Sequence, residues 1–219
     1  QRPNYGWDLG VYFTTNASEV VSLGGAAPFG SLGGWIQEGQ PVPVLRGRLI
    51  TNPTEIAKPV YEQDHLFGSS MPTRTISLNT ALRLPKGIVL SASGEYRGGH
   101  MINRNPISIS RSVRSPICRP FYTDPDNSIA LASDTPALWR ARCTPSERGR
   151  GYWYDSSYFK LRNVSAQIPM DFAFPDDINT AMLTVTLSNS FLWTKELPWM
   201  DPEMLGNQGA NSTGLSSSE

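Results

Sequence analysis

The 219-residue sequence has no long apolar run, no net charge and only two histidines. No stretch approaches the roughly 18 apolar residues of a membrane-spanning helix, so the chain is soluble or enters a membrane only through β-strands. Its 19 basic and 19 acidic residues balance, which argues against a nucleic-acid partner, because proteins that bind nucleic acid carry a basic excess. Helix-forming runs of Ala, Leu, Glu and Lys are also absent, whereas 19 Gly and 18 Pro suit many short strands joined by turns.

The side chains that build common catalytic and metal sites are scarce. His65 and His100 show neither zinc-ligand spacing nor a place in a Ser-His-Asp arrangement. The segment with Asp124, Asp126 and Asn127 lacks the distal Glu of a calcium loop, so ordinary turn chemistry is favoured. Glycine pairs near the N-terminus lack the spacing of phosphate-binding loops. We therefore expect no catalytic residue, no metal and no cofactor, and predict that the chain is not an enzyme.

Cysteine is equally rare. Cys118 and Cys143 are 25 residues apart, without Cys-x-x-Cys spacing. This favours one disulfide over a metal site or two free thiols, and a disulfide implies an oxidising compartment. Both cysteines fall in residues 98–151, a segment of little periodicity that we interpret as a long loop. Within it, residues 134–142 are expected to form one or two helical turns with Pro136 at the first helical position.

What the sequence does contain is alternation of apolar and polar residues, which places alternate side chains on opposite faces of a strand. The clearest run is 183–193, where apolar side chains with an aromatic end alternate with hydroxyl side chains, and only Asn189 breaks the apolar set. It is the second of two strand-like runs within 152–193. Residues 7–13 alternate in the same way, and residues 74–96 form a hairpin whose arms meet in a tight turn at Pro85-Lys86-Gly87.

Other segments give weaker signals. Residues 42–50 are expected to form a short strand whose start is an edge, because Pro41 and Pro43 precede it. Residues 16–38 and 51–72 are expected to be loops. The predicted fold class is all-β and antiparallel, with about six strands. The alternation fits a sandwich strand that faces a core, and equally a membrane-barrel strand that faces lipid on one side and a wet lumen on the other.

Short motifs then point to one class of protein. The run at 155–164 contains Tyr-x-Lys-Leu-Arg-Asn-Val, and Asn-x-x-x-Trp-Thr and Asp-Pro-Glu follow it. Upstream, residues 16–23, 38–41 and 98–103 hold further motifs in collinear order. Together they resemble the SusC-like (SusC/RagA-type) branch of the TonB-dependent outer-membrane transporters. The motif residues are Gly98, Gly99, His100, Asn103, Tyr158, Lys160, Leu161, Arg162, Asn163, Val164, Asn189, Trp193, Asp201, Pro202 and Glu203.

The resemblance implies the C-terminal barrel region of a transporter that imports nutrients such as glycans or peptides across the bacterial outer membrane. Residues 1–219 would be a partial barrel domain, with the Cys-bearing loop and other long loops at the cell surface. The plug domain and the TonB-contact segment are expected in a preceding part, and the closing strand beyond residue 219. Residues 1–8 lack a signal-peptide pattern, so we expect a cleaved precursor or a piece of a longer chain.

Partners follow from the same resemblance: the remainder of the barrel, the plug, the TonB system and a surface lipoprotein. About six strands cannot close a barrel that needs eight or more, so the chain alone is not expected to transport anything. One aromatic cluster is expected to form a girdle at the membrane interface. Its members are Tyr152, Trp153, Tyr154, Tyr158 and Phe159.

Two alternatives stay open at this point. The chain could be a processed extracellular fragment that pairs with other copies of itself through open sheet edges and forms a β-fibre. It could also be a secreted carbohydrate-binding β-sandwich, which would explain the strands and the disulfide but not the collinear motifs.

Overall fold

The computed structural model describes residues 5–103, 117–126, 128, 130–144, 153–170, 180–197 and 201–205. In this part of the chain the structure is antiparallel β-sheet with one short α-helix, which confirms the predicted all-β class. The chain divides into two compact units. The first unit comprises residues 1–16, 72–98 and 157–195, and the second comprises residues 17–71, 99–156 and 196–219.

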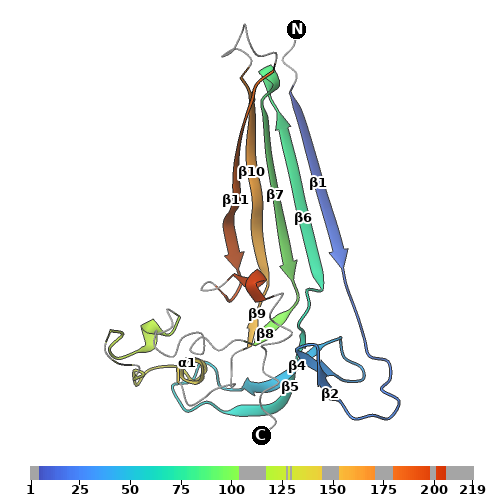
Figure 1. Cartoon of the computed structure of the whole chain (residues 1–219). Helices are drawn as coiled ribbons and strands as arrows, with labels where there is room; N and C mark the ends of the chain where they lie inside the picture. The colour runs from blue at the N-terminus through green and yellow to red at the C-terminus, as the bar shows by residue number, and fades with distance from the viewer. Residues whose placement is uncertain are drawn as a thin grey trace. The chain divides into compact units, whose positions relative to one another are not determined.

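The first unit is a single sheet of five long strands (Figure 1). In spatial order they are β1 (Gly6–Thr15), β6 (Arg74–Arg83), β7 (Val89–Gly98), β10 (Tyr158–Pro169) and β11 (Met182–Thr194). Every neighbouring pair is antiparallel. Each strand has 10 to 13 residues, the length at which a tilted strand crosses a bilayer.

The predicted hairpin turn is present between β6 and β7. It is the 3-10 turn η1 (Pro85–Gly87), closed by a hydrogen bond of 2.8 Å from the amide of Leu84 to the carbonyl oxygen of Ile88. Lys86 and Gly87 both have positive φ, 65° and 76°. A glycine in the second of these positions avoids the steric cost that a Cβ has in the left-handed region.

A β-bulge interrupts β10. The register passes from Leu161 opposite Gly94 directly to Asn163 opposite Ser93, so Arg162 is an extra residue with respect to β7. On the β11 side, Asn189 adopts the left-handed conformation with φ 52°. Asn189 and Ser190 both lie opposite Arg162, so β11 is irregular at this point, and asparagine tolerates the left-handed region better than most residues. This explains why Asn189 breaks the pattern of its strand.

The second unit contains smaller sheets. One has the order β2 (Phe29–Ser31), β3 (Gly34–Ile36), β4 (Val44–Ile50), β5 (Tyr61–Ser69). The other pairs β8 (Met101–Asn103) with β9 (Trp153–Asp155). The helix is α1 (Ala137–Cys143), which overlaps the predicted segment 134–142, but Pro136 is its N-cap in extended conformation and not its first helical residue. A further 3-10 turn, η5 (Pro202–Leu205), begins at the proline of the Asp-Pro-Glu motif.

Three expectations for this unit were wrong. Residues 16–38 hold the β2–β3 hairpin, and residues 51–72 hold β5. The start of β4 is not an edge, because Val44 pairs with Trp35 on one side and Ser69 on the other. β5 escaped detection because its register with β4 shifts twice and Asp64 has φ 57°, so no simple period of two survives.

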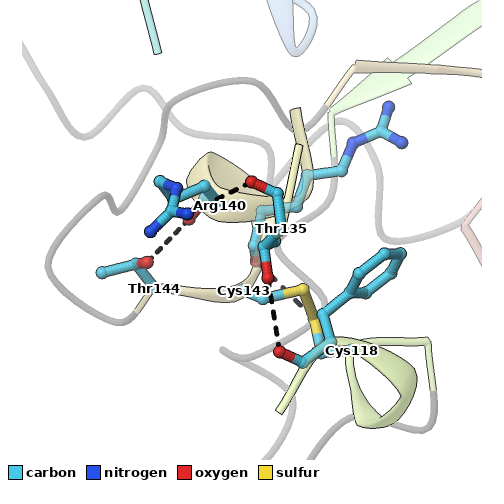
Figure 2. Close-up of a disulfide and its surroundings, with 7 residues drawn as sticks. Cys118, Thr135, Arg140, Cys143 and Thr144 are labelled. Carbon is cyan, nitrogen blue, oxygen red and sulfur yellow. Dashed lines mark hydrogen bonds between the residues drawn. A yellow bond between two sulfur atoms is a disulfide. The ribbon is translucent and has the colours of Figure 1, made fainter. Parts of the chain in front are cut away.

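The disulfide predicted between Cys118 and Cys143 is present, with a Cα–Cα distance of 5.5 Å, and both cysteines are fully buried. Figure 2 shows the disulfide together with hydrogen bonds made by residues in and next to α1. Thr144 Oγ1 donates to the Arg140 carbonyl oxygen at 2.6 Å, and Arg140 Nη2 donates to the Thr135 carbonyl oxygen at 3.2 Å. These bonds satisfy one backbone carbonyl within α1 and one just before it, next to a helix that is too short to be stable by itself.

Candidate functional site

The cross-strand register of the first unit gathers its apolar side chains on one face. Residues directly opposite each other on antiparallel strands share a face, so each row of partners can be followed across the sheet. The four rows are Trp7–Leu82–Leu90–Ala166–Val185, Leu9–Thr80–Ala92–Val164–Leu187, Val11–Leu78–Gly94–Leu161–Phe191 and Phe13–Ile76–Tyr96–Phe159–Trp193. We call this surface the apolar face. It depends on the bulge at Arg162, without which Val164 and Ala166 would turn to the other side.

The apolar face is open to its surroundings. Trp7 is 69% exposed, Leu187 61% and Trp193 46%. Five strands about 4.8 Å apart and roughly 30 Å long give a footprint of about 700 Å². That exceeds the roughly 300–600 Å² of the largest apolar patch on a typical soluble monomer. A β-sandwich would bury this face against a second sheet, and no second sheet covers it within the described part of the first unit, so the sandwich interpretation loses its support.

The opposite face is polar. Its positions carry mainly hydroxyl, amide and charged side chains, among them Ser77, Asn79, Ser91, Ser93, Glu95, Arg97, Lys160, Asn163, Ser165, Thr186 and Ser188. Ser91 Oγ and Ser165 Oγ lie 2.7 Å apart across β7 and β10. Glu95 Oε1 accepts from Arg97 Nε at 2.6 Å and from Arg162 Nη2 at 3.0 Å. An apolar face backed by a hydrogen-bonded polar face is the pattern of a sheet between lipid and a wet lumen.

Aromatic residues mark both ends of the apolar face. One row holds Phe13, Tyr96, Phe159 and Trp193, and we call it the aromatic row. Tyr5 and Trp7 lie at the other end, 66% and 69% exposed. From Leu183 to Trp193 the apolar positions of β11 span roughly 30 Å along the strand. At a tilt of about 40° this is about 25 Å, the height of the apolar band of outer-membrane barrels between its aromatic girdles.

The structure does not bring the described residues of the predicted aromatic girdle together on one face. Of its five members, Phe159 alone is placed by the described residues in the aromatic row. Tyr158 is on the polar face and 3% exposed, and Trp153 and Tyr154 are on β9 of the second unit, where Tyr154 is fully buried. Tyr152 lies outside the described residues. Consecutive residues of a strand point to opposite faces, so a sequence cluster such as Tyr158-Phe159 cannot supply one girdle.

The aromatic row contains three residues that the sequence analysis did not assign to the girdle. Phe13, Tyr96 and Trp193 each sit near the end of an alternating run, and this position was the available signal. Gly94 is part of the same arrangement. A Cβ on Gly94 would lie 2.8 Å from Phe159 Cζ, so the ring occupies the space that glycine leaves open. Aromatic rings commonly cover a strand glycine in this way.

The family-motif residues fall in both units. Those of the first unit are Gly98, Tyr158, Lys160, Leu161, Arg162, Asn163, Val164, Asn189 and Trp193, and those of the second are Gly99, His100, Asn103, Asp201, Pro202 and Glu203. The two groups serve different local structures. Tyr158 to Val164 form the bulged part of β10, whereas the amide of Glu203 donates to Asp201 Oδ1 at 3.0 Å within the terminal turn. The carbonyl oxygen of His100 accepts from the amide of Ser156 at 3.0 Å, beside the β8–β9 pair.

A buried cation organises the second unit. The Arg142 guanidinium lies 4.1 Å from the Tyr154 ring centroid and 5.3 Å from that of Trp139, and Nη2 donates to the Trp153 carbonyl oxygen at 2.9 Å. Burial raises the pKa of the Tyr154 phenol to about 12, an effect that Arg142 opposes and Glu196 reinforces. Burial also lowers the pKa of Arg142, which Tyr154 and Glu196 partly offset. Arg142 thus ties α1 to β9, and no sequence pattern indicated it.

An aromatic stack lies next to the contact between Arg142 and Tyr154. The rings of Phe67 and Trp153 are stacked with centroids 4.2 Å apart, and His65 meets Phe67 edge-on at 4.8 Å. A Cβ on Gly47 would lie 2.2 Å from Trp153 Cζ2, so the indole lies directly on the β4 backbone. These rings cover one another, which makes the stack a packing feature of the second unit. No group of three or more potential metal-ligating side chains occurs among the described residues.

No helix in the described part of the chain is long and apolar enough to cross a bilayer. No protein-family model matches the sequence, and no curated protein matches it.

Solved structures do resemble this chain. A structure of the RagAB peptide transporter matches with a TM-score of 0.57 and 14% identity, over 91% of this chain and 25% of that chain. The RagAB peptide importer matches in its closed-closed and open-open states, each with a TM-score of 0.54 and 14% identity over 91% of this chain. The share of those two chains is 25% and 24%. The chain therefore has a SusC/RagA-like fold and spans about a quarter of the length of these transporter chains.

Proposed function

We propose that the first unit is a section of the barrel wall of a SusC-like outer-membrane transporter that imports peptides or glycans. The apolar face would contact lipid, and the polar face would line the lumen. The observation that carries this proposal is the register, which sorts apolar and polar side chains onto opposite faces over five strands. The height of the apolar band and the aromatic residues at both of its ends support it, as does the likeness to the RagAB structures.

The lengths of the connections supply an orientation. Because the strands are antiparallel, the connections 17–71 and 99–156 both start from the end of the sheet that carries the aromatic row. The connections η1 and 170–181 are short and start from the other end. Outer-membrane barrels have long loops outside and short turns on the periplasmic side. We therefore place the aromatic row near the cell surface.

Partners follow from the incomplete sheet. In the described residues β1 and β11 each have one unpaired edge, and unpaired backbone groups are very unfavourable in lipid. Five strands are fewer than the eight of the smallest closed barrels. Further strands would complete the wall, a plug would fill the lumen, and TonB and a surface lipoprotein would act with it. Transport is then a property of the complete assembly, and we propose no catalytic role for this chain.

A test of this function is the dependence on detergent. The intact protein that carries this chain should remain monodisperse in detergent micelles and precipitate when detergent is removed, because the apolar face then meets water. A protein that stays monodisperse in plain buffer at the same concentration would contradict a lipid-facing role.

Self-assembly is a second candidate function, favoured by the outer edge strand. All but one of the 13 residues of β11 are exposed, and such an edge is a template for pairing with another chain. Electron microscopy of the isolated chain tests this. Fibres that grow with concentration would favour it, and discrete particles at every concentration would contradict it.

A further inference from the structure

The apolar face is not flat. Where small side chains meet larger ones, a hollow of about 550 Å³ opens, within the range of roughly 300–1,000 Å³ that ligand sites occupy. It is lined by Trp7, Thr80, Leu82, Leu90, Ser91, Ala92 and Val164, all of which except Ser91 belong to the apolar face. Thr80 and Ala92 are adjacent partners on β6 and β7 and form the low floor. The hollow lies in the half of the face nearer to η1.

Trp7 forms a wall of this hollow and has no free polar atom to offer. Its Nε1 donates to Thr80 Oγ1 at 2.8 Å, and Thr80 Oγ1 in turn donates to the Asp8 carbonyl oxygen at 3.2 Å. The donors of the indole and of the hydroxyl are therefore both used within the sheet. A site with satisfied polar groups and apolar walls favours an apolar occupant, because burying a polar group there would leave it without a partner.

An exposed lysine lies beyond the end of the hollow. Lys86 is exposed in η1, four residues past Leu82, which is at most about 13 Å along the strand. Leu84 and Ile88 continue the apolar surface between them. Arg83 already has a counter-charge, since its Nη2 lies 2.6 Å from Asp8 Oδ2. A lysine at the end of an apolar band extends its ammonium toward the lipid phosphates.

We propose that the hollow and Lys86 form a binding site for one phospholipid of the leaflet on the short-turn side. One acyl chain would lie in the hollow against Trp7, and the phosphate would meet the Lys86 ammonium. The polarity of the site matches that of an amphiphile, with an apolar lining whose nearest member, Leu82, is at most about 13 Å along the strand from an exposed cation. This inference rests on the proposed function, because it requires the apolar face to contact lipid.

The test uses the intact protein in detergent, titrated with phosphatidylglycerol that carries bromine on its acyl chains. Bromine quenches nearby indoles, so the signal of Trp7 is the difference between the wild type and Trp7→Phe. We expect quenching that saturates at a few lipids per protein. Ala92→Leu fills the floor and should raise the lipid concentration at half-quenching by about tenfold. Lys86→Gln should raise it by about fivefold.

Matched controls separate the site from the surrounding lipid. Ala166→Leu makes the same change on the same face outside the lining, and Lys58→Gln removes a lysine in the second unit. Neither should alter the titration. A brominated diacylglycerol, which lacks the phosphate, should bind the wild type as weakly as the phospholipid binds Lys86→Gln.

Two outcomes overturn the inference in distinguishable ways. Quenching that rises in proportion to lipid, without saturation and equally in every variant, means that Trp7 contacts only bulk lipid. The site is then absent although the barrel function stands. No quenching of Trp7 at any lipid content means that the apolar face does not contact lipid, and the proposed function fails together with the site.

Discussion

Arg162, the residue by which β10 bulges from β7, donates from Nη2 to Glu95 Oε1 at 3.0 Å. The bulge and the ion pair therefore depend on the same residue. The extra residue keeps Leu161 and Val164 on the same face although they are three positions apart, and its side chain reaches the polar face, where Glu95 also accepts from Arg97.

Deleting Arg162 should therefore reduce assembly of the protein far more than replacing it with alanine. The deletion turns Val164, Ala166 and Ile168 toward the polar side, because a shift of one residue reverses every side chain that follows. We expect loss of assembled protein in the membrane fraction. Arg162→Ala keeps the extra residue and should assemble, with a loss of about 1 kcal/mol, since Glu95 keeps Arg97. Equal yields of the two variants would show that the bulge does not set the faces.

Gly94→Ala should destabilise the first unit. The new methyl group would lie 2.8 Å from Phe159 Cζ and 3.3 Å from the Lys160 carbonyl oxygen, and the ring would have to move. A loss of about 1–3 kcal/mol is expected from such overpacking, measured as a shift of the urea midpoint. In the double variant Gly94→Ala/Phe159→Leu part of the loss should return. The control is Gly10→Ala, whose Cβ would meet nothing closer than 3.4 Å.

The sequence predicted those parts of the first unit that are determined by neighbouring residues in the chain. The strands at 7–13, 74–96 and 183–193 follow from alternation, and Pro85-Lys86-Gly87 from turn chemistry. The family-like motifs indicated the fold that the RagAB structures share. The faces of the complete sheet did not follow, because the bulge at Arg162 reverses the parity of β10 and no property of an arginine announces a bulge.

The second unit was harder to predict from the sequence, because its structure depends on contacts that are not local. Its sheets are held by contacts between distant residues, such as Trp153 lying on Gly47 and Arg142 lying on Tyr154. β5 has shifts in register, so its alternation is lost. The disulfide was predictable because the spacing of Cys118 and Cys143 favoured a disulfide over a metal site or two free thiols, and the helix because Pro136 precedes its first turn.

The stability of the second unit should fall with rising pH between about 10 and 12. The Tyr154 phenol keeps its proton in the folded state up to a pKa of about 12, whereas the unfolded phenol releases it near 10. The contribution is complete below pH 10 and is lost as pH rises through 12. Two pH units correspond to about 2–3 kcal/mol, and the lowered pKa of Arg142 acts in the opposite direction.

Urea midpoints at pH 9, 10 and 11 check this prediction. Tyr154→Phe should flatten the fall, and Tyr12→Phe, which removes an exposed phenol, should leave it unchanged. If the slope of stability against pH is the same in all three proteins, the buried phenol is not its source.

Removing the disulfide should destabilise the second unit by about 2–4 kcal/mol, because the unfolded chain gains freedom when residues 118 and 143 are no longer linked. The double variant Cys118→Ser/Cys143→Ser and the wild type in reducing buffer should show the same lowered midpoint. A wild-type midpoint that does not respond to reductant would mean that the link contributes nothing to stability.

The orientation of β11 in the membrane is the most direct test of the proposed function. Single nitroxide labels at residues 183 to 188, in the intact protein within lipid bilayers, report their exposure to oxygen and to a water-soluble nickel chelate. We predict a period of two: Leu183, Val185 and Leu187 positions accessible to oxygen and shielded from nickel, and Thr184, Thr186 and Ser188 positions the reverse. Uniform accessibility along the strand, or nickel access at positions 183, 185 and 187, would contradict a sheet that stands between lipid and lumen.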